Sequence, residues 1–120
     1  MSRTNLMEKE RVIIEQRALR KWRRAVYTPI SIQILRRIIL DSNSGTTINT
    51  IREHLKLQGY TEGKTTVYET IDKLLDAGIL VNIAGKSPKL LKIPEKLYEP
   101  VTSLVLASKR IEEILKKGNI

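Results

Sequence analysis

The sequence has 120 residues, 41% of them hydrophobic and 4% aromatic, which fits one compact domain with a small core of Ile, Leu and Val. Its formal net charge of +9 favours a polyanionic partner. It contains no cysteine and a single histidine, which excludes disulfides, thiolate catalysis and cysteine-based zinc sites and leaves little for histidine-centred metal or general-base chemistry.

The N-terminal segment predicts one long basic helix. Residues 4–26 contain neither Pro nor Gly, and Asn5 with Glu8 fits a capping box at the start. The first 26 residues hold eight Lys or Arg and three Glu, a net charge of +5. Four of these cations share one helix face at spacings i, i+3, i+4 and i+7. They are Arg17, Arg20, Lys21 and Arg24. We leave open whether this face contacts phosphate or is an ordinary solvated surface.

Two further helices are predicted next. Thr28 as N-cap and Pro29 at the first helical position begin a helix that continues over residues 30–40. Residues 41–45 form a loop by composition.

A third helix covers residues 48–57 and is capped by Thr46 or Thr47, an alternative that the sequence leaves open. His54 is expected to be a surface or boundary residue of this helix. Gly59 is the left-handed residue of the turn that follows, where Tyr60 is expected to pack against the core.

The stretch from residue 61 to residue 93 predicts a helix followed by a hairpin. Apolar residues at positions 67, 71, 74 and 75 follow the i, i+4, i+7, i+8 pattern of a helix on a core, and Gly78 ends it. The N-cap is either Thr61 or Gly63. Two β-prone runs, 79–83 and 89–93, flank a short basic turn that contains Lys86.

The C-terminal segment predicts a second long amphipathic helix. Pro100 would interrupt a helix already under way, so we expect the helix to begin there with Glu99 as its cap. The apolar seam has spacings of 4, 3, 4, 3 and 4. It comprises Leu97, Val101, Leu104, Ser108, Ile111 and Leu115. Such a seam can dock on its own core or on a second copy of the chain, and we favour the second copy.

Residues 28–93 resemble winged helix-turn-helix regulators. The resemblance rests on Thr66-Val67-Tyr68, the spaced residues Ile71, Leu74 and Leu75, and then Ala77-Gly78-Ile79-Leu80. This pattern is most similar to that of PadR-like proteins, while the flanking helices also resemble MarR-like regulators and small archaeal winged-helix regulators. Fur-like repressors share a similar helix, but their histidine-rich metal sites have no counterpart here.

The resemblance implies a mainly α fold with a small β-hairpin, organised as one compact domain. Residues 1–27 would be a basic helix for dimer or DNA contact, 28–93 the winged helix-turn-helix, and 94–120 a dimerisation helix. It further implies a homodimer that binds double-stranded DNA and represses transcription. The recognition helix, about residues 63–77, would enter the major groove, and the wing, residues 84–89, would lie on an adjacent groove or the backbone.

Candidate DNA contacts follow from this arrangement. They are Lys64, Thr65, Thr66, Tyr68, Glu69, Lys73, Lys86, Ser87 and Lys89, with Arg17, Arg20, Lys21 and Arg24 of the first helix. Tyr68 can equally pack against the preceding helix. Glu69 either accepts from a cytosine amino group or orients Lys73. Candidate dimer contacts are Met7, Ile14, Trp22, Leu97, Val101, Leu104, Ile111 and Leu115.

Other functions use the same features. One is an architectural or plasmid-partition-type DNA binder with little sequence preference, and another is a winged-helix module for protein contacts. We predict no enzymatic activity, no cofactor and no metal site. MarR-like proteins form effector pockets where Trp22 and Tyr98 would lie, but no polar constellation supports such a ligand here.

No apolar run reaches the roughly 18 residues of a membrane span, so a cytoplasmic, nucleoid-associated protein is expected. The abundance of Ile, Lys and Arg, with no Cys, hints at a thermophilic source, and the resemblance to small archaeal winged-helix regulators implies an archaeal one.

Overall fold

The computed structural model describes residues 9, 17, 20, 22–26 and 28–117, and residues 22–26 are helical. The elements that follow are α2 (Pro29–Leu40), β1 (Thr46–Thr47), α3 (Ile48–Leu57), α4 (Lys64–Asp76), β2 (Val81–Asn82), β3 (Leu90–Lys92) and α5 (Glu95–Lys116). Most of the predicted first helix, including its capping box, lies outside the described residues. No helix in the described part of the chain is long and apolar enough to cross a membrane.

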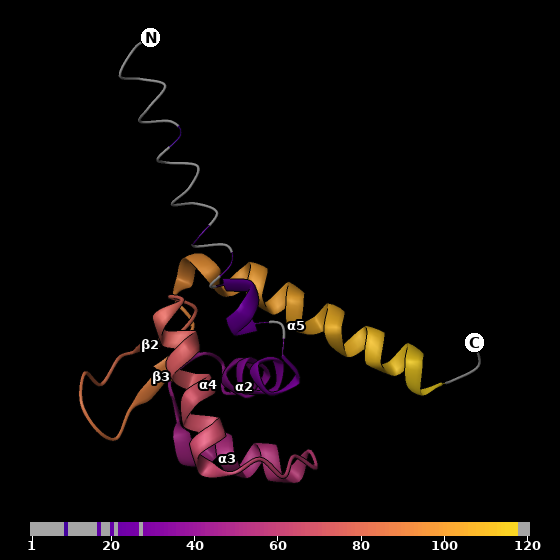
Figure 1. Ribbon diagram of the computed structural model, residues 1–120, viewed down its shortest axis with the longest axis horizontal. Coiled ribbons are helices and arrows are strands. Elements are labelled where there is room, and N and C mark those ends of the chain that lie inside the picture. The colour runs from indigo at the N-terminus through magenta and orange to yellow at the C-terminus, as the bar shows by residue number, and fades with distance from the viewer. Residues whose placement is uncertain (1–8, 10–16, 18–19, 21, 27, 118–120) are drawn as a thin grey trace.

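Helix α2 is the centre of the fold. Its start is as predicted: Thr28 Oγ1 accepts a hydrogen bond from the Ser31 N–H at 3.1 Å, and Pro29 follows as the first helical residue. Helices α3, α4 and α5 all pack against α2 (Figure 1). Because Ile34, Leu35 and Ile38 face these neighbours, their side chains are fully buried.

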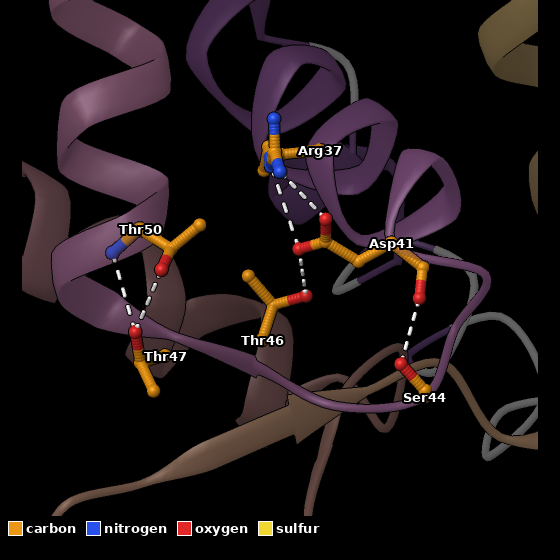
Figure 2. A network of polar contacts seen from close by, with 6 residues as sticks. All are labelled: Arg37, Asp41, Ser44, Thr46, Thr47 and Thr50. Carbon is orange, nitrogen blue, oxygen red and sulfur yellow. Dashed lines mark hydrogen bonds and ion pairs between the residues drawn. The ribbon is translucent and has the colours of Figure 1, made fainter.

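The cap of α3 is Thr47. Its hydroxyl accepts from the Thr50 N–H at 3.3 Å, whereas Thr46 belongs to β1 and donates its hydroxyl to Asp41 at 2.8 Å. Arg37 donates to the same Asp41 carboxylate at 2.6 Å (Figure 2). These contacts tie the end of α2 to β1, which leads directly into α3.

The prediction for His54 is wrong, because this side chain is buried with 6% of its surface exposed. Its Nε2 lies 3.1 Å from Oε1 of Gln33, which is also buried, on α2. Since Gln33 supplies the polar partner that a buried imidazole requires, His54 can occupy the packed face of α3 beside Leu55. Tyr60, in the following turn, packs partly buried against the core, as predicted.

Helix α4 follows the predicted pattern. Val67, Ile71 and Leu74 are buried, and the N-cap is Gly63, which makes no side-chain hydrogen bond. Gly78 ends the helix with a φ of +76°, a conformation that glycine adopts without a steric penalty. The predicted helix over residues 63–77 is therefore confirmed to within one residue at each end.

The hairpin belongs to a three-stranded antiparallel sheet with the order β1–β3–β2. Strands β2 and β3 lie within the two predicted runs but are shorter. Strand β1 is missing from the sequence prediction, because two residues are too few for an alternating pattern. Thr46 pairs with Leu91, which adds a third strand beside the hairpin.

Asn43 ties this sheet to α2. Its side chain accepts from the Ile93 N–H at 2.7 Å and donates to the Ile93 carbonyl at 2.9 Å, and it is buried. Its φ of +53° is in the left-handed region, which Asn tolerates better than most residues. The two hydrogen bonds join the loop after α2 to the end of β3, 50 residues later in the chain.

The predicted start of the last helix is also wrong. Helix α5 begins at Glu95 with Pro94 as its N-cap, and Pro100 lies inside it. Pro100 is the sixth residue of the helix, so it removes one main-chain hydrogen bond close to an end where several N–H groups lack partners anyway. Burial of Val101 and Val105 on the body of the protein offsets that loss.

Candidate nucleic-acid interface

The first turn of α4 presents three polar side chains to solvent. Lys64, Thr65 and Thr66 are exposed, while Val67 immediately behind them is buried and anchors the turn. Gly63 provides no side-chain cap, so no capping side chain accepts from the first N–H groups of this helix. The side chains of Lys64, Thr65 and Thr66 are thus accessible to a ligand.

Tyr68 has a place between core and surface. It is partly buried against the hydrophobic core, and its ring lies under the ammonium group of Lys64, with 5.6 Å between Nζ and the ring centroid. This distance is within the range of a cation–π interaction. Tyr68 therefore packs inward, as one of its two interpretations predicted, and it also supports Lys64, while its own DNA contact stays a prediction.

Tyr68 also lines a hollow of about 280 Å³ at which three elements meet. The N-terminus of α3 contributes Thr47, Ile48 and Asn49, and the wing contributes Ser87, Pro88 and Lys89. The fold therefore brings Ser87 and Lys89 of the wing close to α4, while their contact with DNA stays a prediction. The contribution of α3 was not predicted, because only the packing of the wing brings the N-terminal residues of α3 to this hollow.

The wing is braced at its base by Asn82. The Asn82 Oδ1 accepts hydrogen bonds from the N–H groups of Ala84 and Leu90, both at 3.1 Å. Lys86 is exposed at the turn, next to Gly85 with its φ of +71°. Lys86 is free of any carboxylate in the described part of the chain, so its charge is available to a partner.

Lys89, in contrast, is paired within the protein. Its Nζ lies 3.5 Å from Oδ1 of Asp72, an exposed residue in the middle of α4. The predicted alternative for Glu69, an ion pair with Lys73, is not found in the described residues, and both side chains are exposed. Sequence reasoning missed Asp72, since 17 positions separate it from its partner.

The basic residues before α2 lie elsewhere. Arg24 lines a second hollow, of about 290 Å³, with Ala25, Lys73 and Asp76 at the C-terminal end of α4. Arg17 and Arg20 are exposed, and Lys21 is outside the described residues. Lys73 and Arg24 are thus neighbours at the end of α4 opposite to Lys64.

The candidate dimer residues divide into two groups. Leu97, Val101 and Leu104 pack against the protein's own core, and Val101 is fully buried there. Trp22 also packs partly buried against this core, whereas Ile111 and Leu115 are 57% and 65% exposed. Met7 and Ile14 lie outside the described residues.

Tyr98 lines an open hollow of about 450 Å³, but Trp22 does not. The other lining residues are Ser42, Asn43, Lys92 and Glu95. This hollow therefore does not join Trp22 and Tyr98 in one pocket.

Comparison with known proteins supports the architecture. No protein-family model matches the chain, and no curated protein matches it. Among solved structures, a MepR variant from a multidrug-resistant clinical isolate of S. aureus superposes with a TM-score of 0.53 and 20% sequence identity. The match covers 98% of this chain and 83% of that one, and MepR is a MarR-family winged-helix regulator. This chain therefore has a MarR-like winged-helix fold.

Proposed function

We propose that this protein is a DNA-binding transcriptional regulator whose helix α4 enters the major groove. The observation that carries the proposal is the exposed first turn of α4 beside a basic wing. Lys64, Thr65 and Thr66 are open to solvent at the end of a helix whose other face is anchored in the core. A major groove about 12 Å wide admits such a helix.

The side chains on α4 suit different parts of a duplex. The hydroxyls of Thr65 and Thr66 can donate to or accept from base edges, and Lys64 can donate to guanine or to phosphate. Glu69 lies one turn further along the exposed face, where its carboxylate can accept from a cytosine amino group. Lys86 in the wing can reach phosphates beside the groove, with the net charge of +9 providing long-range attraction.

We further propose that the protein acts as a homodimer that represses transcription at inverted repeats. The C-terminal half of α5 extends beyond the body of the protein (Figure 1). Four large apolar side chains on it are between 50% and 65% exposed: Leu106, Ile111, Ile114 and Leu115. Ile111, Ile114 and Leu115 share one helix face, so a second copy pairing along this segment would cover these three side chains and bring two α4 helices onto one duplex.

Selection from a pool of random duplex DNA at two salt concentrations tests the proposal. We expect an enriched inverted repeat with half-sites about one helical turn apart. Tight binding at low salt that enriches no sequence would replace this proposal with an architectural or partition-type role. Absence of binding at both salt concentrations would overturn DNA binding and favour a protein-interaction module.

A further inference from the structure

The ion pair between Asp72 and Lys89 joins α4 to the wing. Its Nζ–Oδ1 distance is 3.5 Å, and the two side chains are 36% (Lys89) and 64% (Asp72) exposed. Lys89 also lines the hollow in front of Tyr68, together with Ser87 and Pro88 of the wing and the N-terminus of α3. One cation of the wing is therefore engaged by a carboxylate of α4 itself.

The wing does not depend on this ion pair for its position. Asn82 holds both ends of the wing through its two hydrogen bonds, and the Ile83 N–H donates to the Leu90 carbonyl at 2.9 Å. Strand β3 is in addition paired on both sides. Exposed ion pairs contribute little to stability, so the main consequence of Asp72 is electrostatic.

The net charge of the exposed face of α4 also disfavours a phosphate next to Lys89. Beyond the first turn, the exposed ionisable side chains of α4 are Glu69, Asp72, Lys73 and Asp76, which makes this stretch net negative. A phosphate that approaches Lys89 meets the Asp72 carboxylate at the same place. The Lys89 ammonium group has three N–H donors, but the Asp72 carboxylate at 3.5 Å repels an incoming phosphate, so Lys89 gains the full attraction of the phosphate only when it leaves Asp72.

We propose that Asp72 sets the DNA affinity of this protein by occupying Lys89, so that the wing contributes fewer phosphate contacts than its lysines allow. This inference rests on the proposed DNA-binding function. It assigns Lys86 as the wing residue that binds phosphate in the wild-type protein. Lys89 makes no phosphate contact as long as it is paired with Asp72.

The test compares full-length wild type, Asp72→Asn, Lys89→Gln and the double variant on a labelled duplex of random sequence, by fluorescence anisotropy between about 50 and 200 mM salt. Asp72→Asn should bind about three- to fivefold more tightly at the lower salt. Its plot of log affinity against log salt should steepen by about 0.9, the value of one added phosphate contact. This steepening should disappear in the double variant, since Lys89 is absent there.

Glu53→Gln is the matched control, because it removes one exposed carboxylate from α3 without releasing a paired lysine. It should leave the salt slope unchanged. Unaltered or weaker binding by Asp72→Asn overturns the inference, and weaker binding would identify Asp72 as a residue that positions the wing. Either result leaves the proposed function intact. A wild-type protein that does not bind the duplex at the lower salt overturns both.

Discussion

Lys64 and Thr66 differ from Lys86 in the kind of DNA contact that each can make. The first two lie on the exposed turn of α4, from which base edges would be within reach in the proposed complex, whereas Lys86 lies in the wing, where phosphates would be the nearest ligands. Base contacts distinguish sequences, and phosphate contacts strengthen binding to all sequences alike. Substitutions at the two places should therefore have different signatures.

We expect Lys64→Ala combined with Thr66→Ala to weaken binding to the selected sequence by about 1–3 kcal/mol and binding to random duplex by much less. Lys86→Ala should weaken both by the same factor and flatten the salt slope by about 1. Dissociation constants on selected and random duplexes, measured over a salt series, separate the two patterns. Equal losses on both duplexes for the α4 variant would remove α4 as the element that reads sequence.

His54 makes a prediction about stability. Burial lowers its pKa below the ordinary 6.5, the charges of Arg37 and Arg36 lower it further, and Asp41 partly opposes this. The unfolded chain consequently binds the proton more strongly than the folded protein does. The free energy of unfolding should be highest above pH 6.5 and should fall as the pH decreases from 6.5 towards the folded-state pKa.

Urea unfolding at a series of pH values below and above 6.5 measures this dependence. The His54→Gln variant lacks the titrating group, so its free energy of unfolding should depend less steeply on pH in this range. A wild-type profile parallel to that of His54→Gln would show that His54 binds its proton equally well in both states.

At the scale of elements, Gly45 controls how closely the loop before β1 approaches β3. A Cβ atom at this position would lie 2.7 Å from Cγ of Leu90, and the φ of Gly45 is +121°. Gly45→Ala should therefore destabilise the protein through both a steric clash and backbone strain, by about 2–4 kcal/mol in total. Because Leu90 is the first residue of β3, the clash should also displace the wing.

The Gly59→Ala variant is the control for backbone strain alone. Gly59 has a φ of +84° but no heavy atom within 4 Å of its added Cβ, so it should lose only about 1 kcal/mol. Chemical denaturation compares the two variants. If Gly45→Ala were no more destabilising than Gly59→Ala, the approach of Leu90 would not be a constraint on the wing.

The elements that sequence predicted well are those with a repeated local pattern. The spacing of Val67, Ile71 and Leu74 determined the inward face of α4, and Thr28 with Pro29 determined the start of α2, since both signals lie within a few residues of the feature they describe. The two strands of the hairpin lie within runs that local β-prone composition predicted, although the strands are shorter than those runs.

The features that were missed depend on residues far apart in the chain. Strand β1 exists because Asn43 and Thr46 join the α2 loop to the end of β3, and His54 is buried because α2 provides Gln33. For α5, the local signal of Pro100 gave the wrong start, because packing of the helix on the body of the protein outweighed it. The outward positions of Lys64, Thr65 and Thr66 on α4 were predictable, but the ion pair between Lys89 and Asp72 was not.

At the scale of the whole molecule, α5 has two halves with different surroundings. The first half packs on α2 and completes the core of the protomer, whereas the second extends away from the body (Figure 1). A substitution at Leu104 would disturb the protomer itself, because this side chain packs against the core. Ile111 and Leu115 are the better positions for testing association, since both are more than half exposed.

We expect Ile111→Glu with Leu115→Glu to convert a dimer into monomers, because each dimer would bury four added carboxylates at the pairing surface. Light scattering measures the mass, and circular dichroism checks that the protomer stays folded. Leu57→Glu is the matched control, since Leu57 is 85% exposed at the end of α3 and has no role in the proposed pairing. Monomers of the double variant should bind an inverted repeat far more weakly than the wild type does, while binding to a single half-site should be nearly unchanged. A double variant that remains dimeric would move the pairing surface away from the C-terminal half of α5.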